Sequence, residues 1–272
     1  MNRMKYGMFG NLVESHVNIP SGTMHYVSFG RGQRDLIIIQ GLNVRDLKGA
    51  GASLALMYKL FWKDYRVWLF DRRSVVEDGL TNRDLAEDIF DAMNALHIDL
   101  ADVLGVSQGG MIALALTLEH PDRVGKLVLG VTAARANENI KRVVGNWISC
   151  AQKRDHVTIN RETFALMYTD GYLKKFKLLM PLLVRAVKPK DWRRFAVLAS
   201  AILEFDCYDR LHEITCPVLV LGGAQDKITT AKASVEIAQK LSCDLHIYPE
   251  YGHAAYEEAK DFNKRVHDFL LK

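Results

Sequence analysis

Hydrophobic positions along the chain form short apolar runs, separated by longer segments with helical periodicity. Most of the runs are rich in Val, Ile and Leu. Such runs are typical of strands buried on both faces of a parallel sheet. We predict buried strands at residues 35–40, 66–70, 101–106, 126–131, 217–221 and 244–248, preceded by a loosely alternating strand at 22–29.

Helical periodicity occupies most of the segments between these runs. Thr81 and Asp84 have the spacing of a helix N-cap and its N3 partner, so we predict a helix over residues 81–97. We expect further helices at 111–118, near 232–241 and from Glu257, whereas GRGQR at 30–34 is typical of a hairpin turn. The alternation predicts an α/β fold, with a mostly parallel sheet flanked by helices.

The alternation stops between residues 132 and 205. This segment has no strand-like run and consists of basic amphipathic helical stretches interrupted by Pro181 and Pro189. Residues 131–210 contain 15 Lys and Arg against 8 Asp and Glu, a balance of +7, while the rest of the chain carries −3. Such a change indicates an inserted subdomain with its own surface. We predict a core of residues 1–131 and 206–272 and a helical cap at 132–205.

The overall composition is that of an ordinary globular protein. The 272 residues are 49% apolar and 25% charged, and the net charge of +4 gives no reason to expect a nucleic acid partner. No stretch approaches the length of a transmembrane segment, and residues 1–16 lack the apolar run of a secretion signal. The four scattered cysteines have no zinc-ligand spacing, so we expect free thiols in the cytoplasm and no metal.

The first candidate for chemistry is Gly105-Val106-Ser107-Gln108-Gly109, which matches the pattern G-x-S-x-G. The motif is weak by itself, but an apolar strand precedes it and an apolar helix follows. In that setting the serine occupies a strained turn that exposes its hydroxyl above the sheet. Side chains at 105 and 109 would collide across so sharp a turn. A phosphate-binding turn is the alternative, but neither G-x-G-x-x-G nor G-x-x-x-x-G-K-[ST] occurs.

A serine nucleophile needs a base, which is usually a histidine oriented by a carboxylate. Among nine histidines, His253 follows the last predicted strand, and Gly252 before it lets the backbone turn sharply. Asp226 follows the strand PVLVL, whereas Asp206 and Asp209 fit a helix start near the insertion boundary. Asp226 and His253 therefore lie beyond the carboxyl ends of strands, where catalytic groups of open α/β sheets collect.

Taken together, the motifs resemble the α/β-hydrolase superfamily, in particular its capped serine esterases, enol-lactonases and C–C bond hydrolases. The resemblance rests on IIIQG, LFDRRS, LGVSQGGMIALALTLEHPDRVGKLVLG, CPVLVLGGAQD and EYGHAAY, in the family's order. It implies an eight-stranded, mostly parallel sheet with a helical cap. It also implies Ser107 as nucleophile, Asp226 as acid and His253 as base, with the backbone N–H groups of Leu42 and Gln108 as the oxyanion hole.

Two positions depart from the pattern of that family. Relatives commonly have His-Gly where this chain has Gln40-Gly41, so the support of the oxyanion loop is expected to differ. Relatives often read Asp-x-Arg-Gly after the next strand, but DRRS at residues 71–74 lacks the glycine. Because that loop borders the pocket, we expect the shape of the pocket to differ as well.

The resemblance implies a carboxylic-ester hydrolase that acts on a small-molecule acyl substrate, including thioesters and lactones. It would work through an acyl-enzyme on Ser107 and without a cofactor. C–C bond hydrolysis, amide or aminopeptidase cleavage, and cofactor-free haloperoxidase or lyase chemistry are alternatives on the same triad. A non-catalytic ligand-binding protein is an alternative of another class, and a homodimer is left open.

The insertion allows more than one interpretation. Its basic residues could attract an anionic substrate or a membrane surface, although a solvated helix face is the simpler explanation. Its apolar residues could line an acyl pocket or pack the cap on the core. The apolar residues in question are Leu178, Leu179, Met180, Leu182 and Leu183.

Overall fold

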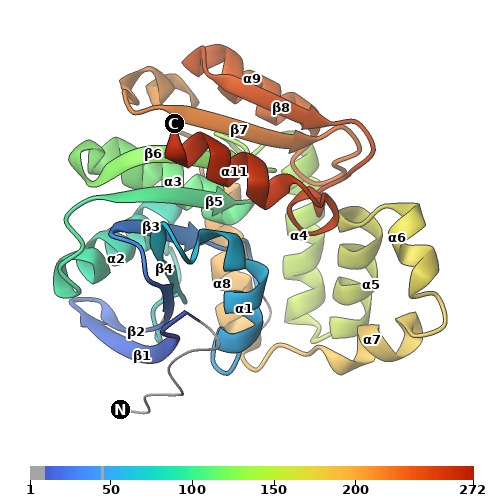
Figure 1. The fold of residues 1–272 in the computed structure, drawn as a ribbon. Helices are drawn as coiled ribbons and strands as arrows, with labels where there is room; N and C mark the ends of the chain where they lie inside the picture. The colour runs from blue at the N-terminus through green and yellow to red at the C-terminus, as the bar shows by residue number, and fades with distance from the viewer. Residues whose placement is uncertain (1–9, 44–45) are drawn as a thin grey trace.

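The computed structural model describes residues 10–43 and 46–272, which include an eight-stranded sheet (Figure 1). The strand order is β1-β2-β4-β3-β5-β6-β7-β8. β2 is antiparallel to both of its neighbours, and all other neighbouring strands are parallel. The strands are β1 (Val13–Ile19), β2 (Gly22–Gly30), β3 (Arg34–Ile39), β4 (Tyr65–Phe70), β5 (Ala101–Val106), β6 (Val124–Gly130), β7 (Val218–Gly223) and β8 (Asp244–Tyr248).

Helices cover both faces of this sheet, as the buried strands require. One face is covered by α2 (Asn82–Ala95), α3 (Gln108–Glu119) and α9 (Ala231–Leu241). The opposite face is covered by α1 (Gly51–Met57) and α11 (Phe262–Leu271). The predicted α/β architecture with a mostly parallel sheet is therefore confirmed.

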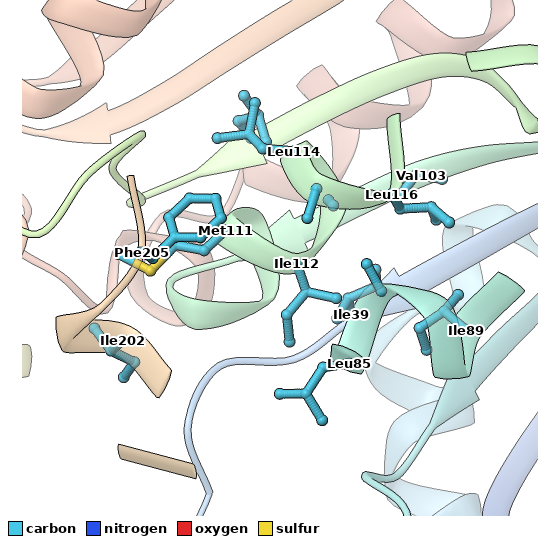
Figure 2. Close-up of a cluster of buried hydrophobic side chains, with 14 of the residues drawn as sticks. Ile39, Leu85, Ile89, Val103, Met111, Ile112, Leu114, Leu116, Ile202 and Phe205 are labelled. Carbon is cyan, nitrogen blue, oxygen red and sulfur yellow. The ribbon is translucent and has the colours of Figure 1, made fainter. Parts of the chain in front are cut away.

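The hydrophobic core lies on both faces of the sheet, because successive side chains of a strand point to opposite sides. In β3, Ile37 and Ile39 join the cluster beneath α2 and α3, while Leu36 and Ile38 join the cluster beneath α11. Figure 2 shows part of the first cluster, where apolar side chains of α3 lie among those of the sheet and α2. The absence of a polar face on α3 reflects the burial of its residues 108–117.

One predicted helix end agrees with the structure, and two differ from it. Thr81 caps α2 as predicted, because its hydroxyl accepts from the Asp84 N–H and the Asp84 carboxylate accepts from the Thr81 N–H. The helix predicted from residue 111 begins earlier, at Gln108. The final helix predicted from Glu257 is instead two helices, α10 (Ala255–Glu258) and α11.

The N-terminal edge of the sheet differs from the expectation. Strand β1 was not located from its mixed sequence, VESHVNI, and it pairs with β2 in an antiparallel hairpin. The hairpin turn predicted at residues 30–34 is wrong, because β4 lies between β2 and β3. The end of β2 and the start of β4 approach each other closely, because a Cβ on Gly30, whose φ is +99°, would lie 2.1 Å from the Tyr65 carbonyl oxygen.

The segment predicted as a helical insertion consists of five α-helices at one end of the sheet (Figure 1). An isolated β-bridge between Arg135 and Asp206 joins the two ends of this segment. The chain therefore leaves the sheet and returns to it at one place. We call these helices the cap. They are α4 (Glu138–Gln152), α5 (His156–Met167), α6 (Asp170–Lys175), α7 (Met180–Ala186) and α8 (Trp192–Leu203).

Three further observations concern the described part of the chain. None of its helices is long and apolar enough to cross a membrane. It contains no cluster of three or more side chains arranged to hold a metal ion. All four cysteines are free thiols, and burial raises the pKa of the Cys207 thiol to about 12, so this group is protonated at neutral pH.

Candidate active site

The loops that follow the parallel strands meet at one edge of the sheet, because parallel strands end on the same side. Ser107 follows β5, Asp226 lies beyond β7, and His253 lies beyond β8. The predicted oxyanion loop, residues 40–43, follows β3. The structure therefore brings together side chains that lie up to 146 residues apart in the sequence.

A continuous chain of hydrogen bonds joins the three candidate catalytic side chains. His253 Nε2 lies 2.9 Å from Ser107 Oγ, and His253 Nδ1 lies 2.9 Å from Asp226 Oδ2. An ionised carboxylate can only accept, so Nδ1 carries the proton and Nε2 is free to accept from the serine hydroxyl. His253 is thus placed to remove the Ser107 proton.

The backbone at Ser107 is strained. Its φ of 55° and ψ of −124° lie outside the regions that residues with a side chain normally adopt. A Cβ at Gly105 would lie 2.5 Å from the Gly109 carbonyl oxygen, which is the predicted collision across the turn. A Cβ at Gly109 would instead lie 1.9 Å from the Ile39 carbonyl oxygen, so this glycine lets α3 begin directly against β3.

Strand β6 anchors this turn through contacts that sequence reasoning missed. The Ser107 N–H donates to the Gly130 carbonyl at 2.9 Å. The Thr132 hydroxyl donates to the Ser107 carbonyl at 2.7 Å, and a Cβ at Gly110 would lie 2.6 Å from the Thr132 side chain. Thr132 directly follows the predicted strand at 126–131, which was the only available signal for this role.

Asp226 is buried and fully hydrogen-bonded. Its Oδ1 accepts from the N–H groups of Ile228 and Thr229 at 2.7 and 3.0 Å. Its Oδ2 accepts from His253 and from the Thr229 hydroxyl, the latter at 2.7 Å. Burial opposes ionisation, but His253 and these hydrogen bonds outweigh it and hold the pKa of Asp226 below its usual value. Thr229 was also missed, although D-x-x-T is the spacing of a turn closed by side-chain hydrogen bonds.

The two predicted oxyanion donors lie in the wall of the cavity that also contains Ser107. Gln108 is the first residue of α3, so its N–H is one of the unpaired donors at a helix N-terminus, where the helix dipole favours negative charge. Leu42 belongs to the loop after β3. This loop passes close to the candidate nucleophile, since a Cβ at Gly41 would lie 3.1 Å from Ser107 Cβ.

Both departures from the family pattern have a structural consequence. The Gln40 side chain accepts from the Asn43 amide at 2.9 Å, which braces the oxyanion loop internally. Arg72 donates to the Gln40 carbonyl at 2.6 Å, and Arg73 pairs with Asp88 of α2 at 2.7 Å. Burial lowers the pKa of Arg72 to about 10, which still leaves it positively charged at neutral pH.

The cap contacts the loops that carry the candidate catalytic residues directly. The side-chain amide of Gln108 donates to the Leu198 carbonyl of α8 at 2.7 Å. At the end of α5, the Met167 carbonyl accepts from the N–H of Ala254, the residue after the candidate base, at 2.9 Å. These contacts join residues far apart in the sequence, so no local sequence pattern could predict them.

A cavity of about 400 Å³ lies between the sheet edge and the cap, with Ser107 and His253 in its wall. Most other lining residues are apolar, so the site suits an acyl group next to a polar reaction centre. The apolar lining side chains include Leu54, Met57, Met111, Ile140, Val144, Trp147, Ile159, Met167, Phe195, Ile202 and Ile228.

Of the two interpretations of the apolar residues at 178–183, the one in which they line an acyl pocket is wrong. None of the five predicted residues belongs to the cavity wall. The side chains of Leu178, Leu179 and Leu182 are 95%, 53% and 67% exposed, so they do not pack the cap on the core either. Apolar composition alone could not distinguish the inner face of the cap from its outer face.

Comparison with known proteins identifies the family. The family model described as alpha/beta hydrolase fold matches residues 37–260. A Caulobacter sp. (strain K31) protein provisionally named carbamate hydrolase RutD is 29% identical, over 82% of this chain and 87% of its own. A 2-hydroxy-6-oxononadienedioate/2-hydroxy-6-oxononatrienedioate hydrolase of Paraburkholderia xenovorans (strain LB400) is 25% identical, over 91% of this chain and 90% of its own.

Solved structures share the architecture. The enol-lactonase from Burkholderia xenovorans LB400 superposes with a TM-score of 0.83 at 23% identity, covering 95% of this chain and 100% of that chain. A thermophilic esterase from Thermogutta terrifontis gives a TM-score of 0.79 at 18% identity, covering 95% of this chain and 98% of that chain. Since the family match spans most of the sequence and the fold agrees, the chain belongs to the alpha/beta-hydrolase family and is a hydrolase.

Proposed function

We propose that this hydrolase cleaves a carboxylic ester, including thioesters and lactones, through an acyl-enzyme on Ser107. The observation that carries the proposal is the hydrogen-bond chain from Asp226 through His253 to Ser107, with both heavy-atom distances at 2.9 Å. The apolar cavity beside Ser107 supports an acyl substrate, and we assign the insertion at residues 132–205 the role of a substrate-covering cap.

Acylation begins when Ser107 Oγ attacks the carbonyl carbon of the substrate. His253 Nε2 takes the hydroxyl proton, and Asp226 stabilises the imidazolium that forms. The carbonyl oxygen becomes an oxyanion that accepts from the N–H groups of Leu42 and Gln108, each of which contributes about 3 kcal/mol to lowering the barrier. Collapse of the intermediate breaks the ester bond, and His253 returns the proton to the departing oxygen or sulfur.

Deacylation repeats these steps with water. His253 removes a proton from a water molecule, whose oxygen attacks the carbonyl carbon of the acyl-serine. The same N–H groups stabilise the second oxyanion. The bond to Ser107 Oγ then breaks, the serine regains its proton from His253, and the carboxylic acid leaves. The proposed cycle requires no metal or organic cofactor.

C–C bond hydrolysis is a second candidate, favoured by cationic side chains in a small cavity of about 70 Å³ beside the oxyanion loop, whose wall also contains aspartates. Arg72 and Lys190 contribute to its wall. Among the described residues, the Arg72 guanidinium donates only to the Gln40 carbonyl, so further N–H groups are available for a substrate carboxylate. The C–C hydrolase relative acts, by its name, on a dioate, which carries two carboxylates.

The first prediction concerns Ser107→Ala. Without the nucleophile no acyl-enzyme forms, so we expect turnover of p-nitrophenyl esters to fall by about 10⁴-fold or more and labelling by a fluorophosphonate probe to vanish. Wild-type activity in this variant would overturn the proposed function.

A substrate panel separates the remaining candidates. Acyl esters, amides and vinylogous diketones should be compared with wild-type enzyme and with Ser107→Ala. Preference for esters supports the first proposal, whereas preference for the diketones supports C–C hydrolysis. Failure of every acyl substrate, together with tight ligand binding, would support a non-catalytic binding protein.

A further inference from the structure

The outer end of the cap carries an apolar surface that the catalytic site does not use. Leu178 and Leu182 have the two highest exposed fractions, 95% and 67%, among large apolar side chains in the described residues. Leu179, which is 53% exposed, lies beside them in the sequence. Leu178 and Leu179 lie between α6 and α7, and Leu182 lies within α7. Both helices lie at the outer edge of the cap in Figure 1, drawn in yellow to yellow-orange.

The same surface is strongly basic. Residues 171–190 contain six Lys and Arg and no Asp or Glu. Five of these cations form no ion pair with any described residue, whereas Lys190 pairs with Asp46. The cap-tip patch is defined by Lys174, Lys175, Lys177, Leu178, Leu179, Leu182, Arg185 and Lys188, all of which are exposed.

The inner side of the same segment is fixed to the cavity wall. Val184 of α7 is buried, while Leu182 and Arg185 face outward. The side-chain amide of Asn160, on α5, donates to the carbonyls of Val184 and Val187 at 2.8 and 2.6 Å. Since Asn160 also lines the active-site cavity, the patch is the outer surface of a cap whose inner surface is that cavity.

We propose that the cap-tip patch docks on a membrane surface that contains anionic phospholipid. Exposed leucines interspersed with four lysines and one arginine that form no ion pair with described residues match such a surface. The leucines enter the boundary of the acyl chains while the cations meet phosphate headgroups. A protein partner fits less well, since protein interfaces concentrate their binding energy in Trp, Tyr and Arg and under-use Leu. Docking would bring the cap and its cavity next to lipid-derived esters.

Vesicle binding tests this directly. Co-sedimentation of the full chain should be measured with vesicles of phosphatidylcholine alone and of phosphatidylcholine with phosphatidylglycerol in equal parts. We expect binding to the anionic vesicles only, weakened by added salt because exposed charges are screened. Absence of binding to the anionic vesicles would overturn the proposal, and an acidic protein would then be the remaining occupant to test.

Two sets of variants locate the surface. Removing three lysines, by Lys174→Gln, Lys175→Gln and Lys177→Gln together, should weaken binding roughly 100-fold, because each charge near an anionic membrane contributes about fivefold. Leu178→Ser with Leu182→Ser should weaken it about tenfold or more, since the apolar contact is lost. Both sets change exposed side chains, so an unaltered circular dichroism spectrum and urea unfolding midpoint serve as the check of folding.

Matched controls distinguish an effect of the cap-tip patch from a general effect of lost positive charge or lost exposed leucines. Lys63→Gln, Lys260→Gln and Lys272→Gln remove the same charge from exposed sites elsewhere, and Leu100→Ser with Leu245→Ser removes exposed leucines that are 55% and 39% accessible. Both controls should bind like wild type. Equal loss in patch and control variants would overturn the proposal. The readout needs no catalysis, so it stands or falls independently of the ester hydrolase function.

Discussion

At the residue scale, the candidate site depends on side chains that orient other side chains. Asp226 holds His253 in the tautomer that can accept the Ser107 proton, and Thr229 completes the hydrogen bonds of Asp226. Thr132 fixes the strained turn of the nucleophile from its carbonyl side. The charges that the proposed reaction needs are therefore paired and hydrogen-bonded before a substrate binds.

A pH-dependent prediction follows from Asp226. Its folded pKa is below its unfolded value of about 3.9, so its ionised form contributes stability that is present above about pH 4 and is lost as the pH falls through the folded pKa. Thr229→Val removes one donor to Oδ2 and raises that pKa. We expect the free energy of unfolding at pH 7 to fall by about 1–3 kcal/mol and acid unfolding to begin at a higher pH.

Circular dichroism during urea unfolding and acid titration measures both effects. Thr229→Ser is the matched control, because it keeps the hydroxyl that donates to Asp226 Oδ2. If Thr229→Val unfolds in acid at the same pH as the wild type and Thr229→Ser, the hydroxyl does not stabilise the ionised carboxylate.

At the element scale, the decisive feature is the junction between β3 and α3. The sheet edge and the helix N-terminus approach so closely that no side chain fits at residue 109. This approach places the Gln108 N–H, the oxyanion loop and Ser107 around one point. The G-x-S-x-G motif predicted that residue 109 has no room for a side chain. The atom that excludes the side chain is the Ile39 carbonyl oxygen of β3, which the motif could not reveal.

Gly109→Ala tests this junction. The added Cβ would lie 1.9 Å from the Ile39 carbonyl oxygen, so β3 and α3 must separate. We expect a loss of about 1–3 kcal/mol in unfolding free energy, as for overpacked cores, and a fall in kcat from the displaced oxyanion donors. Urea unfolding and steady-state ester hydrolysis measure the two effects.

Gly145 provides the control on a helix away from the elbow. It lies inside α4, and an added Cβ there meets nothing within 4 Å. Gly145→Ala should leave turnover unchanged and stabilise the protein by about 0.5–1 kcal/mol. Equal effects of the two substitutions would show that the steric contact at residue 109 is unimportant.

At the scale of the whole molecule, the cavity beside Ser107 is formed by the core and by the helical insertion together. The core supplies Ser107 and His253, and the cap supplies much of the apolar wall through α4, α5 and α8. Hydrogen bonds from Gln108 and Ala254 to the cap join these parts next to the candidate catalytic residues Ser107 and His253. Acyl specificity is therefore expected to depend on how the cap packs as a unit.

Chain-length preference is the corresponding prediction. Each buried CH₂ contributes about 0.8 kcal/mol, so kcat/KM for p-nitrophenyl esters should rise about fourfold per carbon until the cavity is filled. Val144→Phe, which narrows the cavity, should shift the optimum to shorter acyl chains. Ile148→Phe is the control, because Ile148 lies on the same helix outside the cavity. An unchanged optimum in Val144→Phe would place the acyl group elsewhere.

The sequence by itself determined the features that depend on local pattern. Continuous apolar runs predicted six of the strands and loose alternation predicted a seventh. Turn glycines around Ser107 predicted the elbow, because a strained turn excludes side chains. Position beyond a strand end was enough to select Asp226 and His253, since parallel strands place their carboxyl ends together. The edge strand β1 was missed because its mixed sequence has no such run.

Only the tertiary structure decided what depends on contacts between distant segments. It placed β4 between β2 and β3, brought Thr132 and Thr229 to the candidate triad, and set the leucines near residue 178 on the outside of the cap. Apolar composition indicates how much surface a segment tends to bury, but it does not indicate which other segment that surface packs against. That choice is made when the helices of the cap pack, and it leaves a basic, leucine-rich surface facing outward.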